Sequence, residues 1–181
     1  MDTITEYNTV IEQCKTLFIN KTKDYGTSWR ILRASSITDQ LYIKALRIRT
    51  LEEKKVSKVG EGIAEEYIAI VNYCVIAMMQ LQLPAEAPEH LPLEEVNQTY
   101  TALVHETFEL MMAKNHDYGE AWRDMRISSL TDMILTKLYR VKQIEDNNGA
   151  TLVSEGLKAN YQDMLNYAVF ALIKLGFGNQ K

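Results

Sequence analysis

Carboxylates recur at helical spacing in two parts of the chain. Glu61 and Glu65 lie four residues apart, and Glu155 and Asp163 lie eight apart, in the first turns of stretches that continue as largely apolar. Because about four residues complete one helical turn, each set falls on one side of a helix. A ridge of carboxylate oxygens suits Mg²⁺. The pattern therefore predicts a Mg²⁺ site, and leaves open that these acids form a solvated stripe or only favour a helix start through its dipole.

Basic residues form a second set that occurs twice. Arginine forks bind phosphate bidentately and lysine acts as a point charge, so the set predicts an anion site. Salt bridges to the acids described above are the alternative, and surface pairs of that kind are common. The predicted phosphate-binding residues are Lys21, Arg30, Lys44 and Arg47, followed by Lys114, Arg123, Lys137 and Arg140.

An Asp-Tyr-Gly-x-x-Trp segment accompanies each basic set. Its tryptophans could stack on a base, although a tryptophan between helices is more often a core anchor. Its aspartates could be ligands or could bond the turn backbone, and its glycines could take the positive φ of a helix stop. The segments are Asp24, Tyr25, Gly26 and Trp29, then Asp117, Tyr118, Gly119 and Trp122.

These recurrences belong to a duplication of the whole chain. Residues 21–53 match 114–146 at an offset of 93, and residues 61–81 match 155–175 at an offset of 94. Asn72 and Asn166 are kept in both copies, and their amides could tie helices together. Such a regular register indicates two structural repeats and provides an internal comparison of the two copies.

The periodicity predicts an all-α fold. In each copy a first helix runs into the Asp-Tyr-Gly segment, and a short helix can form at 28–34. A second helix starts with Ser36 or Ser129 as N-cap, and a third runs over 61–83 or 155–175. We expect two tandem helical bundles, related by a pseudo-twofold axis that replaces the axis of a homodimer.

The proline-rich stretch at 84–94 divides the chain into repeat 1 (1–83) and repeat 2 (95–181), each long enough for a modest core. The net charge of −4 gives no support for a general nucleic-acid surface. No apolar run is long enough to span a membrane, so we expect a cytoplasmic protein without a membrane partner. Cys14 and Cys74 lie in apolar helical patterns, which indicates buried free thiols.

The order of these motifs resembles a known family. Lys-x-x-Asp-Tyr-Gly-x-x-Trp, then Lys-x-x-Arg, then the carboxylate helix is similar to the nucleotide-modification-associated domain, over about 1–83 and 95–176. The chain also resembles MazG-like proteins of the all-α nucleoside-triphosphate pyrophosphohydrolase superfamily. The resemblance implies a helical bundle, often dimeric or tandemly duplicated. A nucleotide is therefore the expected partner, and a further homo-oligomer is compatible with the resemblance.

The superfamily resemblance also implies Mg²⁺ on helix carboxylates, activating water against the α–β phosphoanhydride of a nucleotide. The pattern falls on Glu61, Glu65 and Ala69 in repeat 1, and on Glu155, Ala159 and Asp163 in repeat 2. Each copy thus lacks one carboxylate, and the paired-glutamate motif of the preceding helix is missing. Either the two half-sets meet across the pseudo-dimer, or the protein binds a nucleotide without cleaving it.

Three functions follow from the sequence. The first is a Mg²⁺-dependent pyrophosphohydrolase acting on a canonical or modified nucleotide, for which no catalytic residue is assigned. The second is a non-catalytic nucleotide-binding module associated with nucleic-acid modification. The third is a structural helical protein in which the basic residues form only salt bridges.

Overall fold

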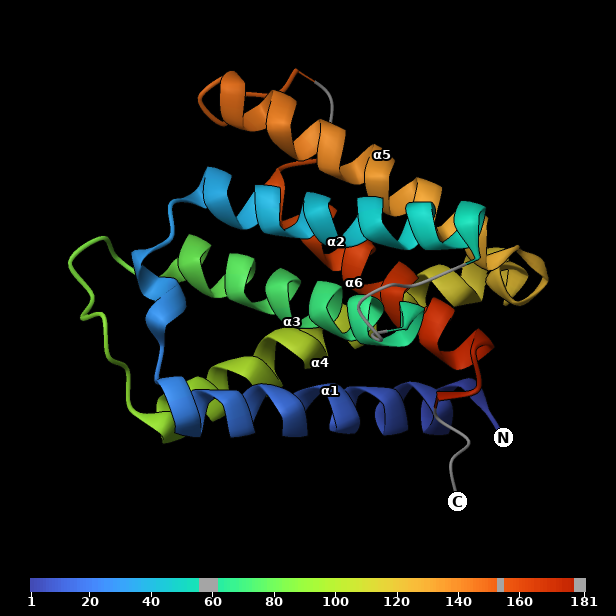
Figure 1. The fold of residues 1–181 in the computed structure, drawn as a ribbon, viewed down its shortest axis with the longest axis horizontal. Coiled ribbons are helices and arrows are strands. Elements are labelled where there is room, and N and C mark those ends of the chain that lie inside the picture. The colour runs from blue at the N-terminus through green and yellow to red at the C-terminus, as the bar shows by residue number, and fades with distance from the viewer. Residues whose placement is uncertain (56–61, 153–154, 178–181) are drawn as a thin grey trace.

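The computed structural model describes residues 1–55, 62–152 and 155–177. Over these ranges all regular structure is helical, and the elements of repeat 1 recur in the same order in repeat 2 (Figure 1). The first copy comprises α1 (Thr3–Tyr25), η1 (Ser28–Ile31), α2 (Ala34–Lys54) and α3 (Ile63–Gln82). The second comprises α4 (Leu93–Tyr118), η2 (Ala121–Asp124), α5 (Ile127–Asp146) and α6 (Leu157–Lys174). The all-α prediction is confirmed.

The two copies share one core. Helices α3 and α6 pack against each other at the centre, with α2 and α5 on one side and α1 and α4 on the other (Figure 1). Both central helices are buried on most sides, and buried apolar residues of both repeats belong to a single cluster. Although each copy is long enough for a core of its own, the apolar faces are buried both within and between the copies.

Reciprocal hydrogen bonds reveal the approximate twofold axis. The Tyr7 hydroxyl donates to Asn166 Oδ1 at 2.7 Å, and the equivalent Tyr100 hydroxyl donates to Asn72 Oδ1 at 2.8 Å. Each bond joins one repeat to the other, and exchanging the two copies converts one bond into its counterpart. The pseudo-twofold arrangement that the duplication predicts is therefore present.

A second reciprocal pair joins α2 to α5. The Thr38 hydroxyl contacts Glu145 Oε1 at 2.6 Å, and the equivalent Thr131 hydroxyl contacts Glu52 Oε1 at the same distance. Burial raises the pKa of both carboxyl groups, while the threonine hydrogen bond opposes that shift. The two repeats are thus joined at both faces of the central layer.

Two local predictions had different outcomes. Gly26 and Gly119 end α1 and α4 with φ of 66° and 61°, so the predicted helix stops are confirmed. The predicted N-caps Ser36 and Ser129 are wrong, because the extended residues Arg33 and Arg126 cap α2 and α5 without a side-chain hydrogen bond. The short helices η1 and η2 end so close to the next helix that the serine falls within its first turn.

The connector between the repeats contains no helix or strand from residue 83 to residue 92, and most of it is exposed. Its prolines lack the amide donors that regular structure needs. α4 begins at Leu93, within the predicted 84–94 linker, and the exact domain limits stay a prediction. Cys14 and Cys74 are buried free thiols, as expected. None of the described helices is both long and apolar enough to cross a membrane.

The reciprocal tyrosine bonds generate a stability prediction. Tyr100→Phe should leave Asn72 Oδ1 buried without its donor, which we expect to cost about 1–3 kcal/mol of unfolding free energy. Tyr139→Phe is the matched control, because Tyr139 is 57% exposed and should change stability little. Urea unfolding of both variants measures the difference, and equal midpoints would contradict the structural role of the bond.

Candidate functional site: twin cavities with lysine pairs

Each repeat has a cavity at an equivalent position. The first cavity, in repeat 1, has a volume of about 550 Å³, and the second cavity, in repeat 2, about 460 Å³. Both are bordered by the Asp-Tyr-Gly turn, the following 3₁₀ helix and the central helix of the repeat. The shared lining positions include Lys21, Tyr25, Trp29, Lys44, Asn72 and Tyr73, and their counterparts Lys114, Tyr118, Trp122, Lys137, Asn166 and Tyr167.

The helix stop gives each cavity its rim. Gly26 combines a φ of 66° with a ψ of −150°, and Gly119 has almost the same values, a conformation that is essentially restricted to glycine. The chain therefore leaves α1 or α4 abruptly and enters the 3₁₀ helix that carries the tryptophan. Tyr25 and Tyr118 stay on the outside of this turn, 70% and 77% exposed. An exposed aromatic ring thus stands at the rim of both cavities.

The tryptophans lie deeper. Trp122 is 5% exposed and stacks on Phe170, with ring centroids 4.3 Å apart and planes 4° from parallel. The Arg123 guanidinium lies 4.4 Å from the centroid of the same indole ring. This packing matches the core-anchor alternative for Trp122, and stacking of a base would require displacement of these neighbours.

The N–H groups of the two indoles have no hydrogen-bond acceptor among the described residues. Trp29 Nε1 and Trp122 Nε1 are both buried, and neither donates a hydrogen bond to any described residue. A buried donor without an acceptor is uncommon in folded proteins. Since the same donor is left over in both copies and each tryptophan lines its cavity, the indole N–H groups are candidate ligand contacts.

A carboxylate joins the two lysines of the second cavity. Asp163, on α6, contacts Lys114 Nζ on α4 at 2.6 Å and Lys137 Nζ on α5 at 2.9 Å. Its side chain is 6% exposed, so the negative charge is compensated inside the protein. The salt-bridge alternative therefore holds for Lys114 and Lys137, although a cavity lies beside the bridge.

The charges of the first cavity are arranged differently. Glu66 on α3 contacts Arg47 Nη1 at 2.9 Å and Lys44 Nζ at 3.6 Å. Lys21 makes no ion pair with any residue that the structure describes. Ala69 occupies the position equivalent to Asp163. The first cavity thus has the same two lysines as the second cavity without the carboxylate that bridges them.

The surroundings of Tyr167 in the second cavity raise the pKa of its hydroxyl. Burial raises the pKa of the Tyr167 hydroxyl, and the nearby Asp163 carboxylate raises it further. Arg140 opposes the shift. Tyr167 therefore stays protonated at neutral pH and can act as a hydrogen-bond donor in this cavity.

The predicted metal ligands do not meet among the described residues. Glu65 lines the first cavity, whereas Glu155 and Asp163 line the second, and Glu61 lies outside the described residues. Both oxygens of Asp163 already contact lysines. Within the ranges that the structure describes, no three His, Cys, Asp or Glu side chains are grouped to hold a metal ion. Among the described residues, Glu65, Glu155 and Asp163 are not grouped as a metal site, and the Mg²⁺ site that includes Glu61 stays a prediction.

None of the four predicted phosphate-binding arginines lines a twin cavity, and two of them hold other segments of the chain. Arg30 holds the connector through the carbonyl oxygens of Ala87 and Pro88, at 2.8 and 3.2 Å. Arg123 contacts Glu6 of the other repeat at 2.5 Å, and Glu120 at 2.9 Å. Both guanidinium groups serve tertiary structure because their positions in the 3₁₀ helices face neighbouring segments.

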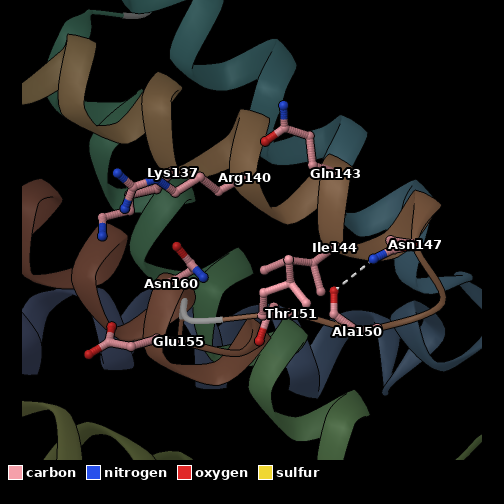
Figure 2. Close-up of a pocket in the computed structure, with 10 residues that line it drawn as sticks. Lys137, Arg140, Gln143, Ile144, Asn147, Ala150, Thr151, Glu155 and Asn160 are labelled. Carbon is pink, nitrogen blue, oxygen red and sulfur yellow. Dashed lines mark hydrogen bonds between the residues drawn. The ribbon is translucent and has the colours of Figure 1, made fainter.

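Arg140 borders a third cavity of about 590 Å³ that shares Lys137 and Glu155 with the second cavity. Figure 2 shows the nitrogen ends of Lys137 and Arg140 at the end of this cavity where Asn160 and Glu155 also lie. Asn160 is the counterpart of Glu66, so Arg140 lacks the carboxylate that binds Arg47 in repeat 1.

The motif aspartates lie at the surface. Asp24 and Asp117 are exposed, and neither lines one of the twin cavities. Asp117 Oδ1 lies 3.1 Å from Nδ1 of its neighbour His116.

Glu66 is a charged residue of the candidate site that sequence reasoning missed. It is buried and compensates two cations, but its counterpart is Asn160, so comparison of the copies gives it no weight. The available signal was its place inside an apolar helix, three residues before Ala69. A carboxylate there needs a cationic partner.

A comparison with protein families finds the same duplication. A family model described as nucleotide modification associated domain 1 matches residues 21–81 and again residues 114–175. The chain belongs to this family. Both matched segments of this nucleotide modification associated domain 1 protein contain the turn, the lysines and the central helix of one cavity. No curated protein and no solved structure matches the chain significantly, and the resemblance to MazG-like proteins is not confirmed.

The bridge in the second cavity generates a stability prediction for this family member. Asp163→Asn keeps the size of the side chain but removes the charge that two lysines share. Breaking a fully buried ion pair costs roughly 3–5 kcal/mol, and since Lys114 is 44% exposed we expect a somewhat smaller loss. Asp132→Asn is the control, because that carboxylate is 63% exposed and lies 3.7 Å from Arg49. Urea unfolding at low and high salt checks the prediction, which an unchanged Asp163→Asn stability would contradict.

Proposed function

We propose that this protein binds an anionic nucleotide in a cavity of the twin type, which is lined by two lysines and a tryptophan. The observation that carries the proposal is the recurrence of the same cavity in both repeats, with two lysines next to aromatic side chains. The family match over both copies supports association with nucleotide modification. A structural protein would need the lysines only as salt bridges, and Lys21 makes none with a described residue.

The chemistry of the first cavity fits the parts of a nucleotide. Its volume of about 550 Å³ falls within the roughly 300–1,000 Å³ of small-molecule pockets. Lys21 and Lys44 offer ammonium groups to phosphate, and the Trp29 indole offers a hydrogen bond to a base or sugar oxygen. The exposed ring of Tyr25 offers a stacking surface at the rim.

Mg²⁺-dependent release of pyrophosphate is the second candidate activity. Glu65 favours it, because this predicted ligand borders the first cavity and makes no ion pair with a described residue. The described acids do not form a complete metal cage, so we assign no catalytic step to them. Incubation with Mg²⁺ and each deoxynucleoside triphosphate distinguishes the candidates. Pyrophosphate release identifies cleavage, and thermal stabilisation without turnover identifies binding.

Lys21 provides the direct test of nucleotide binding. Lys21→Ala should weaken binding of deoxynucleoside triphosphates by tenfold or more, because a hydrogen bond to a charged group contributes about 1.5–3 kcal/mol. Lys23→Ala is the matched control, since Lys23 is exposed on the same helix and does not line the cavity. Calorimetric titration measures both affinities. Equal affinities of the two variants, or no nucleotide binding by the wild type, would refute the proposed function.

A further inference from the structure

The acids of the twin cavities lie at different positions of the central helices, and Glu65 borders only the first cavity. Repeat 2 has Asp163 on its central helix, where repeat 1 has Ala69. Repeat 1 has Glu66 instead, three residues earlier, where repeat 2 has Asn160. Three residues correspond to almost one helical turn, so the acid faces a different set of cations in each copy.

In the second cavity the acid forms ion pairs with both lysines. Asp163 Oδ1 lies 2.6 Å from Lys114 Nζ, and its Oδ2 lies 2.9 Å from Lys137 Nζ. Both distances are those of charge-assisted hydrogen bonds. A phosphate that entered this cavity would have to displace a buried carboxylate or share its lysines with it.

In the first cavity the acid makes its shortest contact with a cation outside the lysine pair. Glu66 makes its close contact with Arg47, at 2.9 Å, on the next turn of α2. Lys44 Nζ lies 3.6 Å from Glu66, which is an ion-pair distance but too long for a hydrogen bond. Lys21 has no carboxylate partner among the described residues. Of the two equivalent ammonium groups in the first cavity, Lys21 has no described carboxylate partner and Lys44 has only the longer ion pair with Glu66, so neither is held by the short bonds that Asp163 makes in the other copy.

We propose that the first cavity is the only phosphate site of the pair, and that Asp163 takes the place of the phosphate in the second. This inference rests on the site of the proposed function and adds its stoichiometry: one polyphosphate group per chain. The second cavity keeps its shape because an internal anion replaces the external one. Its lysines then stabilise the fold, whereas Lys21 and Lys44 bind ligand.

Exchange of the residues at the two equivalent positions tests the proposal. Inorganic tripolyphosphate serves as the probe, titrated without divalent metal and followed by calorimetry. We expect one site in the wild-type protein and two in Asp163→Ala, where the second lysine pair becomes available. Ala69→Asp should abolish saturable binding, because it supplies the first cavity with the same internal anion. Gln82→Glu adds a negative charge to an exposed position at the end of the same helix and should keep one site.

The outcomes separate this inference from the proposed function. Two sites or no site in the wild type, or one undiminished site in Ala69→Asp, would overturn the inference. A folded Asp163→Ala that still binds one equivalent would also overturn it, with folding checked by circular dichroism. If Asp163→Ala does not fold, the wild type and Ala69→Asp still decide. Tripolyphosphate binding with the expected stoichiometries, but no binding of any deoxynucleoside triphosphate, would refute only the proposed function.

Discussion

Two buried asparagines fix the central helices to the outer ones. Asn72 on α3 donates to the Cys14 carbonyl of α1 at 3.1 Å and accepts from Tyr100 of α4. Asn166 on α6 makes the equivalent contacts, donating to the Thr107 carbonyl of α4 at 3.3 Å. A buried amide that loses a partner is costly, so both donors and acceptors must find each other when the repeats pack. The rest of the arrangement depends on this requirement.

The same asparagines line the twin cavities, which joins the fold to the site. Because each amide is held by both outer helices, the cavity wall is fixed by contacts that need both repeats. A single repeat would lack the tyrosine that orients its own asparagine. The duplication therefore supplies, within one chain, the partner contacts that an equivalent homodimer would provide.

In each repeat, the position of a buried carboxylate on the central helix determines which cations of the neighbouring helices it pairs with. A buried acid must be compensated, and the nearest cations of the neighbouring helices provide that charge. At the position of Asp163 the nearest cations are the two cavity lysines, and at the position of Glu66 they are Arg47 and Lys44. A shift of almost one turn changes the electrostatics of the cavity without changing the packing of the helices.

The sequence by itself determined the features that depend on local chain chemistry. Apolar periodicity established six long helices, repetition established the twofold relation, and Gly26 and Gly119 established the helix stops, because a positive φ is a property of one residue. It also indicated that Asn72 and Asn166 tie helices together. The serine caps were wrong because the preceding 3₁₀ helix determines where the next helix begins.

Only the tertiary structure decided which charges meet. Helical spacing places acids and bases on faces, but a partner is chosen by how α2 and α5 lie across α3 and α6. Asp163 bridges two lysines, and Glu66 pairs with Arg47. Arg30 and Arg123, which the sequence assigned to phosphate, instead contact the connector and Glu6. Ion pairs form between side chains that are distant in sequence, so their geometry exists only once the helices have packed.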